Sequence, residues 1–124
     1  MGFLDKFSYQ ILGITRIVAG LLFLEHGTSK HLNFPPSAMS PSLTSLSGVA
    51  GVIEIVTGVM IVLGFFSRPA AFIASGTMAF AYWLVHAKSS IFPVLNRGDA
   101  AILFCFLFLY IAAAGPGAFS INKK

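Results

Sequence analysis

Glu54 is the residue whose position most strongly suggests chemistry, because it lies in the middle of an otherwise apolar stretch from Leu46 to Gly64. The chain contains only four acidic residues in total. If this stretch is a helix that crosses a membrane, an ionised carboxylate at its centre costs roughly 2.5 to 3.5 kcal/mol unless another group offsets that cost. We therefore expect Glu54 to have a partner and a task.

Arg16 is the partner that we expect for Glu54, because it interrupts the first apolar segment of the chain. At a rise of 1.5 Å per residue, the depths of the two side chains differ by roughly 10 Å or less, which a guanidinium side chain can largely span. This predicts an ion pair between the first and second helices. The pair could be the floor of a ligand site, or it could only fix the register of the two helices.

Further polar residues gather toward the same side as Glu54 and are candidates for ligand binding or proton handling. Protons for a quinone could be supplied or oriented by Glu54, Glu25 and His86. Ordinary anchoring at the membrane surface is the competing interpretation for the cations and for the aromatic residues. The candidate set is Arg16, Glu25, His26, Lys30, Glu54, Tyr82, His86, Asn96, Arg97 and Asp99.

Metal and cofactor signatures are weak in this sequence. Histidines such as His26 and His86, on two helices of one bundle, can ligate a haem iron, but no haem-attachment cysteine pair and no second histidine couple accompany them, which disfavours haem b. The histidines and Cys105 lack the spacing of a zinc site. No nucleophile with an adjacent base and no glycine-rich phosphate loop occur, so no catalytic residue is assigned.

The composition predicts an all-α membrane protein. Of the 124 residues, 56% are hydrophobic and 10% are charged, against about 25% charged in a soluble domain. The mean hydropathy is +0.86. The eight cations that give the net charge of +4 are scattered, which argues against a nucleic-acid partner.

Four apolar segments predict a single domain over 1–124 built as a four-transmembrane-helix bundle. The predicted spans are 9–31, 46–64, 69–87 and 99–115. The first segment lacks a small-residue cleavage site, so we expect it to remain as an anchor. Four crossings place both termini on one side, and the distribution of Lys and Arg favours the cytoplasmic side.

Helical spacing predicts which faces of these segments point inward. In the second segment the inner stripe contains Gly51, Glu54 and Gly58, and small residues on such a stripe permit close approach of helices. The corresponding stripes are Arg16, Gly20, Phe23, Gly27 and Lys30 in the first segment, and Ser75, Ala79, Tyr82 and His86 in the third.

Several short motifs together make the chain resemble the DoxX family over about its whole length. They are Arg16 with Gly20, Glu25-His26-Gly27 with Lys30, the Gly51, Glu54 and Gly58 stripe, Leu63-Gly64, Ser67-Arg68-Pro69-Ala70-Ala71, Asn96-Arg97-Gly98-Asp99-Ala100-Ala101, and Gly115-Pro116-Gly117 before Ser120. Arg97-Gly98-Asp99 stands where Gly-Gly-Glu is common in the family. The acid at the helix start is kept, and we expect it to cap that helix.

The resemblance implies a small four-helix, multi-pass protein of the bacterial inner membrane. Its relatives have been linked to thiosulfate oxidation with quinone as acceptor, to catechol or quinone stress, and to membrane redox complexes. One hypothesis is therefore an oxidoreductase-associated subunit that binds quinone or a small phenolic compound and receives electrons from another polypeptide. The alternative is a non-catalytic scaffold for a protein partner or a second copy, with the loop 33–45 as its docking surface.

Overall fold

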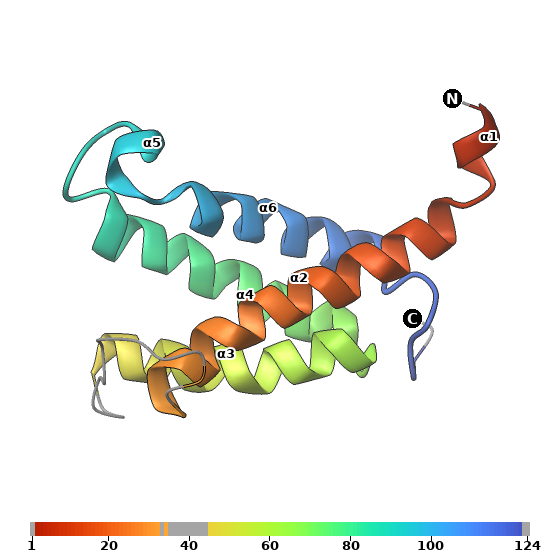
Figure 1. The fold of residues 1–124 in the computed structure, drawn as a ribbon, viewed down its shortest axis with the longest axis horizontal. Helices are drawn as coiled ribbons and strands as arrows, with labels where there is room; N and C mark the ends of the chain where they lie inside the picture. Colours follow the sequence, from red (N-terminus) through yellow and green to blue (C-terminus); the bar gives the residue numbers. More distant parts are fainter. Residues whose placement is uncertain (1, 33, 35–44, 123–124) are drawn as a thin grey trace.

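The computed structural model describes residues 2–32, 34 and 45–122, and the regular secondary structure of this part of the chain is all helical (Figure 1). A short turn of helix, α1, precedes the first long helix, and another, α5, precedes the last one. The elements are α1 (Gly2–Asp5), α2 (Ser8–His31), α3 (Leu46–Leu63), α4 (Ser67–Ala81), the π-helix η1 (Tyr82–His86), α5 (Pro93–Asn96) and α6 (Asp99–Ala114).

Local sequence signals explain where the central helices begin and end. The hydroxyl of Ser45 accepts a hydrogen bond of 3.0 Å from the backbone N–H of Gly48, which caps the start of α3. Gly64 ends α3 in the left-handed conformation with φ of 70°, which glycine adopts without steric cost. Pro69 lies in the first turn of α4, where its missing N–H leaves no helical hydrogen bond unmade.

The long helices form two antiparallel pairs, α2 with α3 and α4 with α6, and the pairs are joined through α3 and α4. The expected inner stripes of the first two segments are buried apart from Lys30, whereas in the third stripe only Ser75 is buried and Ala79, Tyr82 and His86 are half-buried. Arg16, Phe23 and Glu54 are at most 1% exposed, and the glycines that accompany them in α2 and α3 are buried too.

Glycines set the separation of α2 and α3. A Cβ atom on Gly27 would lie 2.6 Å from the carbonyl oxygen of Gly51, and one on Gly58 would lie 3.0 Å from the Cα of Leu24. Only the absence of side chains at these positions lets the two backbones come so close.

The helix bounds differ from the expected segments mainly in the third one. Residues 69–87 were expected as one regular helix, but the α-helix ends at Ala81 and continues as η1. A π-helix changes the hydrogen-bond register without changing the hydrophobic pattern, so the pattern does not reveal it. The short helix α5 was not expected, and most of the predicted 33–45 loop lies outside the described residues.

By length and composition, α2 and α3 could each cross a membrane, while α6 is a shorter apolar helix. The two termini lie at the same end of the molecule, and α2 and α6 diverge toward the opposite end (Figure 1). The end of α2, the start of α3, α5 and the start of α6 all lie at that opposite end.

Candidate functional site: a buried ion pair at the open end of the bundle

Glu54 forms an ion pair with Lys30. The ammonium nitrogen of Lys30 lies 2.8 Å from Oε1 of Glu54, and the two side chains are 24% and 2% exposed. The pair therefore joins a buried carboxylate on α3 to a cation near the end of α2 that water can reach. A charge-assisted hydrogen bond in such apolar surroundings is strong because little solvent competes with it.

The predicted ion pair between Arg16 and Glu54 is wrong. The guanidinium of Arg16 donates instead to backbone carbonyl oxygens that converge on it from two directions. Its Nε donates to Ile61 on α3 at 2.9 Å. Its terminal nitrogens donate to the segment after α6, at 2.6 Å to Pro116, 2.9 Å to Ala118 and 2.7 Å to Phe119.

Depth could not distinguish the two possible partners of Glu54. Glu54 is eight residues into α3, Lys30 is one residue from the end of α2 and Arg16 is fifteen residues from that end. At 1.5 Å per residue, both cations differ from Glu54 by roughly 10 Å in depth. Lys30 is the partner of Glu54 because backbone carbonyl oxygens at the other end of the bundle already accept the hydrogen bonds that Arg16 donates.

A histidine that the sequence did not single out helps to hold Lys30 in place. Nε2 of His31 donates to the carbonyl oxygen of Gly48 at 2.7 Å, which ties the end of α2 to the start of α3. Lys30 and His31 both pass over Gly51, where an added Cβ would lie 3.2 Å from Cδ of Lys30 and 2.6 Å from Nε2 of His31. The spacing of Gly48 and Gly51 opposite the end of α2 is the signal that could have revealed this contact.

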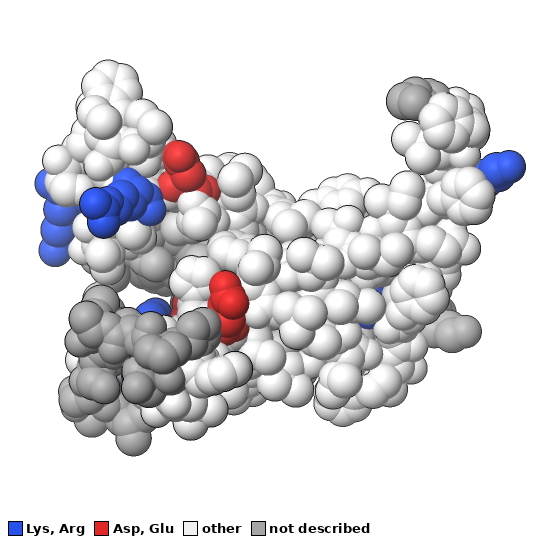
Figure 2. Space-filling view, in the orientation of Figure 1, with Lys and Arg blue, Asp and Glu red and all other residues white. Residues whose placement is uncertain are grey.

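Charged side chains gather at the end of the molecule away from the termini (Figure 2). In this view they lie on both sides of a hollow that separates the α5 and α6 side from the α2 and α3 side, and the middle of the face carries none of them. The polar candidates are therefore concentrated in one region, apart from Arg16.

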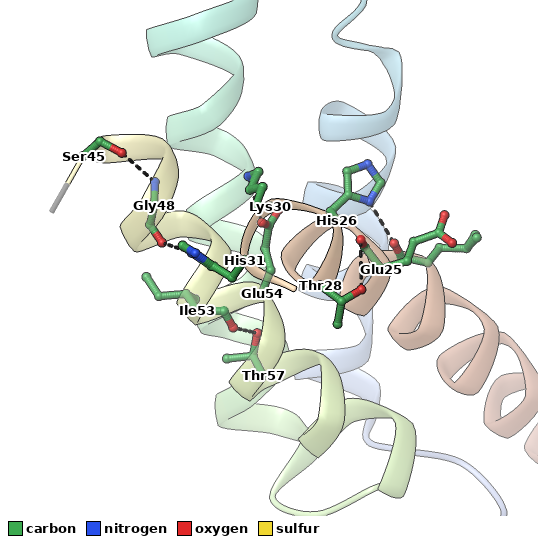
Figure 3. A network of polar contacts seen from close by, with 11 residues as sticks. Glu25, His26, Thr28, Lys30, His31, Ser45, Gly48, Ile53, Glu54 and Thr57 are labelled. Atoms are coloured by element: carbon green, nitrogen blue, oxygen red, sulfur yellow. Dashed lines mark hydrogen bonds and ion pairs between the residues drawn. The ribbon is translucent and has the colours of Figure 1, made fainter. Parts of the chain in front are cut away.

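Figure 3 separates the residues of α2 that face the ion pair from those that do not. Lys30 and Glu54 point toward each other, whereas the carboxylate of Glu25 points away from them. His26 is exposed, and its Nδ1 donates to the carbonyl oxygen of Leu22 at 2.8 Å.

Asn96 organises a second polar cluster across η1 and α5. Its amide nitrogen donates to the hydroxyl of Tyr82 at 3.1 Å and to the carbonyl of Ser90 at 2.9 Å. Nδ1 of His86 donates in turn to the carbonyl oxygen of Asn96 at 3.0 Å. Since Asn96 is only 4% exposed, these bonds give it a structural role, which is to hold α5 against η1.

The last two candidates, Arg97 and Asp99, are both exposed on the surface between α5 and the first turn of α6. Arg97 is exposed and ends α5 with a φ of 61°. Asp99 stands in the first turn of α6 as expected, where its charge meets the positive end of the helix dipole. It does not cap the helix, because the N-cap residue is Gly98 and no side-chain cap bond is made.

Metal-binding groups do not assemble in the described residues: no three His, Cys, Asp or Glu side chains there come together as a metal ion would require. Cys105 is free, and its carbonyl oxygen accepts a bond from the hydroxyl of Ser75 at 2.7 Å. Its thiol therefore lies in the packed contact between α4 and α6.

Comparison with known proteins identifies the family. The family model described as DoxX matches residues 11–87, which include most of α2, the whole of α3 and α4, and the Lys30–Glu54 pair. The chain belongs to the DoxX family.

Two relatives are similar to this DoxX protein over most of their length. An uncharacterized protein of Haemophilus influenzae is 40% identical over 135 residues, which cover 100% of this chain and 97% of the relative. The inner membrane protein YphA of Escherichia coli is 30% identical over 128 residues, which cover 92% of this chain and 89% of YphA. No solved structure matches significantly. These findings support a membrane protein of the bacterial inner membrane.

Proposed function

We propose that this DoxX protein is a subunit of a redox-linked membrane complex and binds a quinone or a small phenolic compound beside Lys30 and Glu54. The protein crosses the inner membrane four times, with both termini in the cytoplasm and the ion pair near the opposite surface. At 16 residues, α6 is roughly 24 Å long, so the bilayer must thin slightly around it.

The observation that carries the proposal is the unequal burial of the two partners in the ion pair. Lys30 remains 24% exposed, so its ammonium can donate a further hydrogen bond to a carbonyl or phenolate oxygen. Glu54 is 2% exposed, so a ligand meets the Lys30 ammonium first, and the carboxylate behind it can accept the proton of a phenolic hydroxyl by way of Lys30. The pair thus combines a donor that a ligand can reach with an acceptor behind it, as a quinone and its reduced form require.

The electrons come from another polypeptide. Reduction of a quinone to the quinol takes up two electrons and two protons at its two oxygens. The Lys30 ammonium and the surrounding water can supply these protons, with Lys30 reprotonated from water, and a partner protein that carries a redox cofactor supplies the electrons. The DoxX protein then contributes binding and proton handling within an oxidoreductase complex.

Binding of a methyl-substituted benzoquinone to the protein in lipid nanodiscs tests this function. We expect Lys30→Met and Glu54→Gln to weaken binding about tenfold each, because the first removes the charged contact to the head group and the second removes the carboxylate that holds the ammonium in place. Glu25→Gln is the matched control, since its carboxylate is exposed and points away from the pair. Equal affinity in the wild type and Glu54→Gln would contradict the proposal.

A scaffold without ligand chemistry is the second candidate, and the contacts of Arg16 favour it. They fasten α2 to α3 and to the segment after α6, and they leave no group of Arg16 for a ligand. If the protein is only a scaffold, we expect a double variant with Lys30→Met and Glu54→Gln to co-purify with the same partner protein as the wild type. Loss of that partner in the double variant would speak against a purely structural role.

A further inference from the structure

An apolar groove runs along the outside of the bundle where α2 and α6 diverge. Its volume is about 490 Å³, within the range of small-ligand sites. Thr15 contributes the only side-chain hydroxyl of the lining. The full lining is Ile14, Thr15, Val18, Ala19, Leu22, Ala100, Leu103, Phe104 and Leu107.

Two helical stripes face each other across this groove. On α2, Thr15, Ala19 and Leu22 recur at helical spacing, and the next residue of the same stripe is His26. On α6, the stripe is formed by Ala100, Leu103, Phe104 and Leu107. The apolar lining therefore leads along α2 to a polar residue at the open end of the molecule.

His26 contacts two residues of the groove lining. Its Nδ1 donates to the carbonyl oxygen of Leu22, and its ring packs edge-on against Phe104 with 5.9 Å between the centroids. Because Nδ1 is the donor to a carbonyl, Nε2 of the neutral ring is an acceptor. His26 and Lys30 are four residues apart on α2, so they are neighbours on the helix surface.

We infer that the groove between α2 and α6 holds the hydrocarbon tail of a lipid-soluble ligand, whose polar head lies between His26 and Lys30. The inference rests on the proposed function and deepens it, because it selects a long-chain quinone or quinol over a small water-soluble phenol. A quinol hydroxyl can donate to Nε2 of His26, and a quinone oxygen can accept from Lys30. An apolar channel with a polar mouth matches the two halves of such a molecule.

The mouth of the groove favours a single amphiphilic ligand over a helix from a second protein. His26 and Lys30 place polar groups at one end of an otherwise apolar lining, which matches one polar head joined to one alkyl or isoprenoid chain.

Filling the groove tests the inference. We compare binding of a methyl- and a decyl-substituted benzoquinone with the same head group to the protein in nanodiscs. Ala100→Trp places a large ring in the groove, and we expect it to weaken binding of the decyl compound about tenfold, as steric exclusion of a few methylenes does. Binding of the methyl compound should stay unchanged. Ala113→Trp, at an exposed alanine of α6 outside the groove, is the matched control.

The outcomes separate this inference from the function on which it rests. If Ala100→Trp leaves the affinity for both compounds unchanged, the tail site is wrong, while a loss of both in Glu54→Gln would still support the head-group site. If the wild type binds neither compound, both proposals fail. A change of oligomeric mass in Ala100→Trp, without a loss of decyl binding, would assign the groove to a second copy and overturn the inference. Ala100→Leu repeats the test with a smaller side chain if the tryptophan variant does not fold.

Discussion

The carboxylate of Glu54 lies 2.8 Å from the ammonium of Lys30, and the exposed fractions of the two side chains differ by more than tenfold, 2% against 24%. The pair is therefore asymmetric in its energetics as well as in its position. Loss of the exposed partner strands a buried charge, whereas loss of the buried partner leaves a cation that can turn toward water.

This asymmetry predicts that Lys30→Met destabilises the protein more than Glu54→Gln. We expect the free energy of unfolding to fall by about 3 kcal/mol or more in Lys30→Met, because Glu54 is left buried and unpaired. In Glu54→Gln the loss should be about 1 kcal/mol, because Lys30 can reorient toward solvent. Unfolding in mixed detergent micelles measures both, and the double variant should recover part of the loss of Lys30→Met. Equal losses in the two single variants would contradict the asymmetry.

Arg16→Lys should destabilise the protein although it keeps the charge. A guanidinium donates in several fixed directions, and an ammonium cannot reach the carbonyl oxygens of Ile61, Pro116 and Phe119 together. Buried carbonyl groups left without a donor cost about 1 to 3 kcal/mol each. Thermal unfolding in detergent measures the loss.

Arg68→Lys is the control for the Arg16 substitution. Arg68 is exposed and donates to the carbonyls of Ala112 and Ala113 at the end of α6, where water can replace it. We expect a loss below about 1 kcal/mol.

A combined exchange of Arg16 and Glu54 should not restore stability, because these two side chains do not form the ion pair, and recovery in that variant would argue for the pair.

The close contact of α2 and α3 predicts opposite effects of two Gly→Ala substitutions. Gly27→Ala places a Cβ 2.6 Å from the carbonyl oxygen of Gly51, so the helices must separate, at a cost of about 1 to 3 kcal/mol. At Gly76, within α4, an added Cβ meets no atom within 4 Å. Gly76→Ala should therefore leave stability unchanged or raise it by up to about 1 kcal/mol. Melting temperatures of the two variants test the contact, and equal effects would contradict it.

The proposed topology predicts a labelling pattern for single cysteines introduced into a Cys105→Ser background. Cysteines in place of Lys6 and Asn122 should react with a membrane-impermeant thiol reagent only from the cytoplasmic side, because Lys6 directly follows α1, Asn122 is two residues from the C-terminus, and the two termini lie at the same end. A cysteine in place of Lys88 should react only from the opposite side. Labelling of all three from one side would be incompatible with four crossings.

Hydrophobic periodicity predicted the inner faces of the helices well. It could not predict contacts made by irregular segments, whose sequences have no helical repeat. The spacing of Gly51, Glu54 and Gly58 correctly placed the carboxylate inside, because helix geometry fixes which residues share a face. The partner of Glu54 was missed, because two cations at similar relative depth cannot be ranked without knowing which other acceptors surround them.

Three acceptors of Arg16 are the backbone carbonyls of Pro116, Ala118 and Phe119, in a segment that follows no periodic pattern. The Gly115-Pro116-Gly117 motif stands at the end of the last predicted segment, and nothing in its composition states where the following residues run. The π-helix η1 could not be predicted from the sequence either. Its hydrogen bond from the N–H of Ala87 to the carbonyl of Tyr82 changes the helical register but leaves the apolar pattern unaltered.

The contacts of Arg16 also set an order of events in biosynthesis. The guanidinium belongs to the first long helix, and its acceptors Pro116, Ala118 and Phe119 lie 100, 102 and 103 residues later in the chain. Until the ribosome has released those residues, the guanidinium in α2 lacks part of its acceptors, and a charge in that state is costly within a membrane. A chain interrupted before residue 116 therefore keeps a cation in α2 that lacks these three acceptors.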